Sequence, residues 1–352
     1  MAGRKRTARR VATQLDNFTH SLTGWALGQT GLKDKSRKGL AALILGANMP
    51  DIDVFFGWVS WAPLAVHRGF THSLVGGVLF LPPILAGLLW LLDRWQLGRG
   101  ATFNSGLPMR VGWLVGLSYI GAASHPLLDL QNTYAVQLLS PLSSDWFHND
   151  ALFIIDVWLW GALALGIGLS RLRERRGGEW MRPARIALAV AVTYISLNAG
   201  LSVMAKRSLA ASGAIVRPDA LFAGHEPVRF WRRNLVWREN GAIGRARYGL
   251  FAGLHDVQPA RDDHMDDPLA RRAKRADASV IAFMRWSVVP MARIEREQCV
   301  ATVRFGDARF GERRVSTRFE QRVRLALTGR GCPAVAARLP SSDEARRSGG
   351  HG

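Results

Sequence analysis

The chain contains very little cysteine: Cys299 and Cys332 are the only two among 352 residues. They form no CxxC pattern and lie far from the histidine-rich part of the sequence, which excludes a zinc knuckle and a thiolate-bound metal there. Two possibilities stay open for the pair itself. It could form one disulfide if the C-terminal region lies outside the cytoplasm, or it could remain two thiols.

Acidic residues are scarce relative to basic ones. Lysine and arginine together number 47, against 27 aspartates and glutamates, which gives a formal net charge of +20. Such an excess can serve nucleic-acid binding, the cytoplasmic loops of a membrane protein, or attraction to anionic lipid headgroups. The basic residues are scattered and no nucleic-acid-binding motif occurs, so we expect membrane lipids rather than nucleic acid as partners.

The sequence also lacks internal repeats and the pattern of a removable signal peptide. Basic residues near the N-terminus resemble the start of such a signal, but Asp16, Asn17 and His20 interrupt the apolar stretch that follows. No small-residue cleavage site comes after it. We therefore expect residues 1–14 to form a basic N-terminal tail.

Long apolar segments are present, but they are confined to residues 1–205. The segment 73–92 has no charge and about the twenty residues that a bilayer requires. Two shorter segments, 18–32 and 39–49, predict a helical hairpin that is re-entrant or only just spans the membrane. Further candidate spans are 111–128, 151–169 and 184–205.

Basic residues are distributed unevenly over the loops between these segments. Followed back and forth across the bilayer, the chain places loops 33–38, 93–110 and 171–185 on one side, with thirteen basic residues. Loops 50–72 and 124–150 fall on the other side and carry a single arginine. The positive-inside rule then makes the first side cytoplasmic and the second extracytoplasmic. The side of the N-terminal tail stays open, because it depends on whether the first segment spans.

The C-terminal region is polar and rich in arginine. Residues 299–305 and 314–319 alternate between apolar or β-branched and polar side chains, which predicts strands. Three tryptophans, Trp231, Trp237 and Trp286, could supply a small core. This region is therefore expected to form a β-rich domain.

The predicted fold is mainly α-helical, a multi-pass transmembrane helical bundle followed by a small β-rich soluble domain. We place the bundle at residues 15–205 and the soluble domain at 206–340. Residues 341–352 are expected to be a disordered tail.

Histidines and aspartates gather on the predicted extracytoplasmic side. Ionisable groups at membrane depth are costly and persist where they pair, line a wet cavity or hold a metal. His125 and Asp129 are spaced i, i+4, which places both on one helix face. The alternative is that His125 caps a helix end and Asp129 bonds a backbone amide. Asp51 and Asp53 follow Pro50, so a loop could present both carboxylates, although this is also an ordinary turn sequence.

A second group of candidates surrounds Gly69, which permits a tight turn between His67 and His72. Thr71 or Ser73 could cap the helix that follows. The positive end of that helix should lower the proton affinity of His72, as a metal-ligating imidazole needs. The alternative is that both histidines lie in the polar interface without a role.

For other polar residues, a structural role explains the sequence more simply than a metal site does. Asp156 lies in an apolar segment, shortly after His148 and Asp150, and a hydrogen bond to a serine or tyrosine would account for it. In the C-terminal region, the acidic cluster 262–267 lacks the glycine and the terminal glutamate of a calcium loop. A solvated surface loop explains it better than a metal site does.

These motifs resemble those of the bacterial membrane-bound metal-dependent hydrolases, the YdjM-like inner-membrane proteins. The resemblance covers residues 15–205, and its most specific part is His67-Arg68-Gly69-Phe70-Thr71-His72-Ser73. Residues 217–239 and 286–290 also look like the downstream region of such proteins. The resemblance implies a multi-pass inner-membrane hydrolase. Its presumed metal ligands are His20, Asp51, Asp53, His67, His72, His125 and Asp129.

Our first hypothesis is a metal-dependent hydrolase in which metal-activated water attacks an ester or phosphoester, with lipids among the candidate substrates. Mixed histidine and aspartate ligation suits zinc, with manganese as the alternative, in one or two ions. His20 or His67 would complete the shell or act as acid or base, and Arg68 could hold a substrate phosphate. The rival hypotheses are a non-catalytic metal-binding membrane protein, structural or sensing, and an ion transporter. The sequence leaves the oligomeric state open.

Overall fold

The computed structural model describes residues 17–56, 59, 64, 66–311 and 319–327. The chain divides into two compact units. The helical unit comprises Met1–Leu201 with His225–Phe230, and the C-terminal unit comprises Ser202–Gly224 with Trp231–Gly352. The predicted N-terminal tail, the predicted disordered tail and Cys332 lie outside the described residues.

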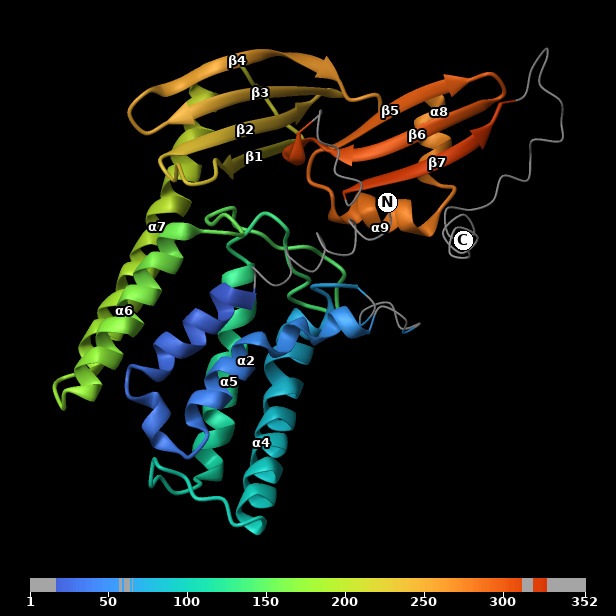
Figure 1. Ribbon diagram of the computed structural model, residues 1–352. Helices are drawn as coiled ribbons and strands as arrows, with labels where there is room; N and C mark the ends of the chain where they lie inside the picture. Colours follow the sequence, from blue (N-terminus) through green and yellow to red (C-terminus); the bar gives the residue numbers. More distant parts are fainter. Residues whose placement is uncertain (1–16, 57–58, 60–63, 65, 312–318, 328–352) are drawn as a thin grey trace. The chain divides into compact units, whose positions relative to one another are not determined.

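The helical unit begins with a hairpin in which residues 17–28 form a helix and α2 returns over Gly39–Asn48. The chain then passes through two short 3₁₀ helices, Met49–Phe55 and Phe70–His72. A π-helical turn, Leu74–Phe80, leads directly into α4. The long helices are α4 (Leu81–Gly98), α5 (Val111–Asp129), α6 (Val157–Arg175) and α7 (Met181–Ala211) (Figure 1).

Three described helices are long and apolar enough to cross a membrane: Leu74–Gly98, Val111–Asp129 and Met181–Ala211. The predicted fold class, a multi-pass helical bundle followed by a β-rich region, is confirmed. The predicted span 151–169 is not one of these three, and α6, which covers part of it, starts only at Val157. The side chain of Asp156 accepts hydrogen bonds from the N–H groups of Trp158 and Leu159 and caps this helix.

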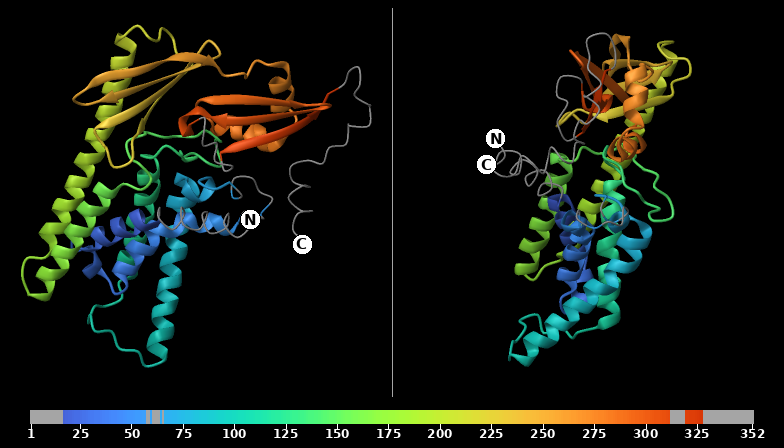
Figure 2. Two further views of the ribbon diagram at one scale, coloured as in Figure 1. Left: turned by 45° about the horizontal axis from the view of Figure 1, so that its top comes forward. Right: turned by 90° about the vertical axis from the view of Figure 1, so that its right-hand side faces the viewer.

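Close packing between α2 and α5 depends on small residues. A Cβ atom on Gly121 of α5 would lie 2.5 Å from the carbonyl oxygen of Leu43, and one on Gly46 of α2 would lie 2.9 Å from that of Ser118. Bare glycine surfaces therefore let the two backbones approach each other. The α4 helix packs against α5 (Figures 1 and 2), and an apolar cluster extends the contact between α2 and α5 to α4. Its buried members are Ala42, Leu43, Leu85, Ala86, Leu89, Leu114 and Leu117.

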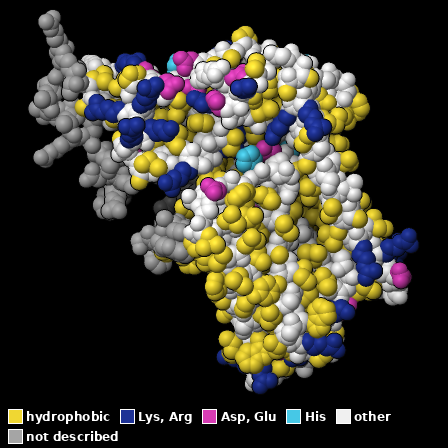
Figure 3. All heavy atoms as spheres, turned by 180° about the vertical axis from the view of Figure 1, so that it is seen from behind, with side chains coloured by type: hydrophobic (Ala, Val, Ile, Leu, Met, Phe, Trp, Pro, Cys, Tyr) yellow, Lys and Arg dark blue, Asp and Glu magenta, His cyan; other side chains and the backbone are white. Residues whose placement is uncertain are grey.

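The loops of the helical unit meet at its two ends as the alternating path predicts. At one end, Lys33 Nζ lies 2.5 Å from Glu174 Oε1, and the N–H of Arg37 donates to the carbonyl of Pro108 at 3.0 Å. At the other end, the N–H of Gln137 donates to the carbonyl of Arg68 at 2.9 Å. Hydrophobic side chains cover much of the surface of this unit, and Lys and Arg side chains gather at the first end (Figure 3).

The C-terminal unit contains two antiparallel sheets. The first has the strand order β1-β2-β3-β4 and the second the order β5-β6-β7. Strands of the first sheet are β1 (Ala220–His225), β2 (Arg232–Glu239), β3 (Ala242–Gly249) and β4 (Gly253–Asp262). Between the sheets in sequence come α8 (Pro268–Lys274) and α9 (Ala278–Trp286). Strands of the second sheet are β5 (Pro290–Glu297), β6 (Val300–Asp307) and β7 (Glu320–Ala326).

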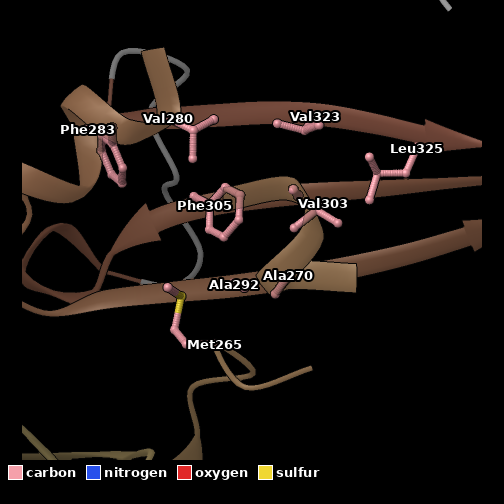
Figure 4. Packing of buried hydrophobic residues seen from close by; sticks show 10 residues of the cluster. Met265, Ala270, Val280, Phe283, Ala292, Val303, Phe305, Val323 and Leu325 are labelled. Carbon is pink, nitrogen blue, oxygen red and sulfur yellow. The ribbon is translucent and has the colours of Figure 1, made fainter. Parts of the chain in front are cut away.

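The second sheet packs against α8 and α9 around a buried apolar cluster that includes Phe283, Val303 and Phe305 (Figure 4). The alternation at 299–305 is borne out by β6, whereas most of 314–319 lies outside the described residues. Among the tryptophans, Trp237 is buried and Trp286 packs at the edge of the cluster. Cys299 is disulfide-bonded.

Candidate metal centre

Four separate stretches of chain bring the predicted site residues to one end of the helical unit. His20 comes from the first helix, and Asp51 and Asp53 come from the 3₁₀ helix that follows α2. His72 ends the 3₁₀ helix Phe70–His72. His125 and Asp129 occupy the last turns of α5, on the same face as their i, i+4 spacing predicts.

Five of these residues form what we call the inner cluster: His20, Asp51, His72, His125 and Asp129. His72 Nε2 lies 3.3 Å from Asp51 Oδ1 and 3.5 Å from Asp129 Oδ2. His125 Nε2 lies 3.4 Å from Asp129 Oδ2 and 3.7 Å from Asp51 Oδ1. His20 Nε2 lies 3.5 Å from Asp129 Oδ1. Three imidazoles and two carboxylates therefore form two overlapping groups that share His125, each with a spacing that could hold a metal ion.

The inner cluster is almost completely buried. His20, His72, His125 and Asp129 are at most 1% exposed, and the side chain of Asp51 is 12% exposed. Within the described part of the chain, His125 Nε2 and Asp129 Oδ2 have no hydrogen-bond partner. A buried polar atom without a partner is costly. These two atoms, in a set of imidazole and carboxylate donors, fit a divalent metal ion such as zinc or manganese.

The environment of His125 determines which of its nitrogens faces the cluster. His125 Nδ1 lies 2.7 Å from the carbonyl oxygen of Ala47 on α2. The ring of His20 stacks on that of His125 with a centroid distance of 3.7 Å. Because a carbonyl can only accept, Nδ1 of His125 carries the hydrogen and Nε2 keeps its lone pair.

Asp53 and His67 lie beside the inner cluster rather than in it. Asp53 Oδ1 lies 2.8 Å from His67 Nδ1, and Asp53 Oδ2 lies 3.2 Å from His72 Nδ1. Asp53 is buried, whereas the side chain of His67 is 44% exposed. Asp53, His67 and His72 also form a group whose spacing could hold a metal ion.

Arg68 is buried and engaged with the protein. Its Nη1 donates to Asn132 Oδ1 at 2.9 Å, and its Nη2 lies 3.4 Å from Asp129 Oδ1. Asn132 Nδ2 in turn donates to Asp129 Oδ1 at 3.2 Å. In the structure Arg68 therefore contacts a carboxylate of the inner cluster, and its contact with a substrate phosphate stays a prediction. The sequence interpretation missed Asn132, although its position three residues after Asp129 was a usable signal.

In the turn between His67 and His72, Arg68 adopts the left-handed conformation with φ 65°, whereas Gly69 has φ −87°. The prediction about His72 is wrong, because its pKa is raised, to about 9, and not lowered. Burial works to lower the pKa of His72, but hydrogen bonds and charges from Asp51, Asp53 and Asp129 outweigh it.

The remaining polar candidates have structural partners. His148 Nδ1 lies 2.9 Å from Asp150 Oδ1, apart from the inner cluster. Asp156 accepts a hydrogen bond from the Tyr194 hydroxyl at 3.0 Å, as the simpler explanation expected. In the acidic cluster of the C-terminal unit, Asp263 pairs with Arg238 and Asp267 caps α8.

Two comparisons with known proteins find matches, one over the helical region and one over most of the chain. A family model described as "YdjM inner membrane protein" matches residues 15–206, a range that contains the inner cluster. The chain is similar to "Uncharacterized protein YfhP" of Bacillus subtilis (strain 168), with 22% identity over 311 residues. That alignment covers 84% of this chain and 87% of the relative. No solved structure matches the chain significantly.

Proposed function

Because the chain belongs to the YdjM inner membrane protein family, we propose that it is a metal-dependent hydrolase of the bacterial inner membrane. Its substrate would carry an ester or phosphoester, and membrane lipids are the nearest source of such groups. The observation that carries this proposal is the inner cluster, where the unpartnered atoms His125 Nε2 and Asp129 Oδ2 face each other at 3.4 Å.

The five residues of the inner cluster would hold the ion. A divalent ion there would lower the pKa of a water ligand and polarise a carbonyl or phosphoryl oxygen. His67 is the titratable side chain at the exposed edge of the site, so we assign it the transfer of a proton. Arg68 and Asn132 would keep the Asp129 carboxylate in place.

Two rival functions make different demands on the site. A structural or sensing site would be closed to water on all sides, whereas Asp51 and His67 lie at a partly exposed edge. Transport would need ligands on both sides of the membrane midplane. Among the described residues, the grouped histidines and aspartates of the helical unit lie at one end of it. Both observations favour hydrolysis.

We further propose that the site faces the extracytoplasmic side. The loops at the opposite end carry thirteen basic residues, and most of these have no ion-pair partner among the described side chains. The disulfide at Cys299 favours an oxidising compartment for the C-terminal unit. Maleimide labelling of single cysteines introduced at Ser105 and Ser143 in intact cells tests this. Labelling at position 105 together with protection at position 143 would contradict an extracytoplasmic site.

The proposal is tested by metal analysis of the purified protein and of His72→Ala and Asp51→Ala. We expect a stoichiometric ion in the wild type, its loss in both variants, and metal-dependent hydrolysis in a screen of esters, phosphodiesters and phospholipids. Asp145→Asn, which changes an exposed carboxylate at the same end, is the control. A folded wild type that binds no divalent metal would contradict the proposal.

A further inference from the structure

We infer that Asp53 is a positioning residue that orients His72, and that metal binds in the inner cluster and not at Asp53. This inference rests on the proposed metal-binding function and separates Asp53 from the residues that would ligate an ion. By distance alone, three groups of described residues could each hold an ion, two of them within the inner cluster and the third formed by Asp53, His67 and His72. The inference excludes the third.

The oxygens of Asp53 are already occupied by donors from the protein. Oδ2 accepts the backbone N–H of Arg68 at 2.9 Å and the hydroxyl of Thr71 at 3.0 Å, and it faces His72 Nδ1 at 3.2 Å. Oδ1 faces His67 Nδ1 at 2.8 Å. An ionised carboxylate has about four lone-pair sites, so four donors fill them. The Asp53 side chain is also 1% exposed, which leaves little room for an ion or its water ligands.

Asp129 provides the contrast within the same site. Its Oδ2 has no hydrogen-bond partner among the described residues, yet it lies within 3.5 Å of both His72 Nε2 and His125 Nε2. An oxygen that is buried, unpartnered and surrounded by imidazole nitrogens is placed as a metal ligand would be. Asp129 therefore has an oxygen that can bind an ion, whereas both oxygens of Asp53 already face donors from the protein.

The two nitrogens of His72 face different groups. Nδ1 lies 3.2 Å from Asp53 Oδ2 and 3.1 Å from the hydroxyl of Thr71, which itself donates to Asp53 Oδ2. Nε2 faces Asp51 and Asp129. A carboxylate that accepts the Nδ1 hydrogen fixes the tautomer and the ring orientation, so that the Nε2 lone pair faces the ion. The carbonyl of Ala47 fixes the tautomer and ring orientation of His125 in the same way. Asp53 therefore has the role for His72 that this carbonyl has for His125.

Three variants separate a positioning role from ligation, all measured in the full-length protein in detergent. Asp53→Asn should keep the zinc content of the wild type but bind zinc 10- to 100-fold more weakly in a chelator competition. Its Co²⁺-substituted form should keep the visible absorption band of the wild type. Asp129→Asn should lose the stoichiometric ion.

His67→Gln is the third variant, chosen because this side chain is partly exposed and its replacement should fold. We expect it to keep the metal content of the wild type, because the hydrogen-bond partner of His67 is Asp53 and its ring meets that of His72 only edge-on, at a centroid distance of 5.6 Å. The loss of an ion, relative to the wild type, in either Asp53→Asn or His67→Gln would overturn the inference. Such a result would leave the metal-dependent function standing, whereas a wild type without metal would remove both.

Discussion

The Nδ1 atom of His125 lies 2.7 Å from the backbone carbonyl oxygen of Ala47, across the contact between α5 and α2. This hydrogen bond links helix packing to ligand chemistry, because it decides that Nε2 is the nitrogen offered to the inner cluster. The two helices can approach closely enough for it only where they present glycine to each other. The site therefore depends on residues that carry no functional group.

Gly121→Ala should test this dependence. Its Cβ would lie 2.5 Å from the carbonyl oxygen of Leu43 and 3.1 Å from the amide nitrogen of Ala47, so the helices must separate. We expect a loss of about 1–3 kcal/mol in the free energy of unfolding, together with weaker metal binding. Gly116→Ala on the same helix is the control, since nothing lies within 4 Å of its Cβ. Thermal unfolding and chelator competition in detergent measure both effects, and equal behaviour of the two variants would refute the link.

The sequence predicted which residues meet at one end of the bundle. It did not predict which of them lie in the inner cluster and which lie beside it. Spacing and the alternating path of the chain were enough to bring His20, Asp51, His72, His125 and Asp129 to one end of the bundle. They could not separate Asp51 from Asp53, because the difference lies in which neighbours donate to each carboxylate. The backbone N–H of Arg68 reaches Asp53 only after Arg68 adopts a left-handed conformation that no pattern indicated.

The prediction about the proton affinity of His72 was wrong for the same reason, namely that local sequence does not show which distant groups will surround a side chain. A helix N-terminus was expected to lower its proton affinity, but the carboxylates that dominate its surroundings come from distant segments. Likewise, Asp156 belongs to an apolar run in the sequence, yet it caps α6. Periodicity locates a helix well, whereas its first residue is decided by a side-chain hydrogen bond.

Arg68→Gln should destabilise the metal-free protein more than the metal-bound protein. The guanidinium of Arg68 is a cation beside buried Asp129, and removing one partner of a buried ion pair typically costs about 3–5 kcal/mol. A bound divalent ion would supply positive charge to the same carboxylate and reduce that loss. Unfolding temperatures with EDTA and with zinc measure the difference, with Arg94→Gln as an exposed control. An equal loss under both conditions would argue against an ion at Asp129.

Removal of the metal should lower the stability of the wild type. A ligand that binds only the folded state at 100 times its dissociation constant adds about 2.7 kcal/mol to the free energy of unfolding. We therefore expect zinc to raise the unfolding temperature of the wild type and EDTA to reverse the effect. His20→Ala should lose most of this response, and His255→Ala, which changes a histidine of the C-terminal unit, should retain it. A zinc response that is the same in both variants would mean that the ion binds elsewhere.

Asp307→Asn should weaken the C-terminal unit in a pH-dependent manner. Asp307 is buried, with Arg309 Nε at 3.0 Å and the Ser287 hydroxyl donating to it at 2.7 Å. Burial alone would raise the pKa of Asp307, but the charge of Arg309 and these hydrogen bonds hold it below its ordinary value. A carboxyl whose folded-state pKa is depressed stabilises the fold above the unfolded-state pKa of about 3.9 and loses that effect as the pH falls through the folded-state pKa.

The variant should therefore be destabilised near neutral pH, by about 3–5 kcal/mol for the loss of one partner of a buried ion pair. The gap between variant and wild type should narrow as the pH falls below about 4, because the wild-type carboxyl then becomes protonated. Hydrogen exchange of peptides from β5 and β6 measures this in the full-length protein. Asp262→Asn, at an exposed carboxylate, is the control and should match the wild type. A gap that stays constant between pH 7 and pH 3 would mean that the charge of Asp307 does not stabilise this unit.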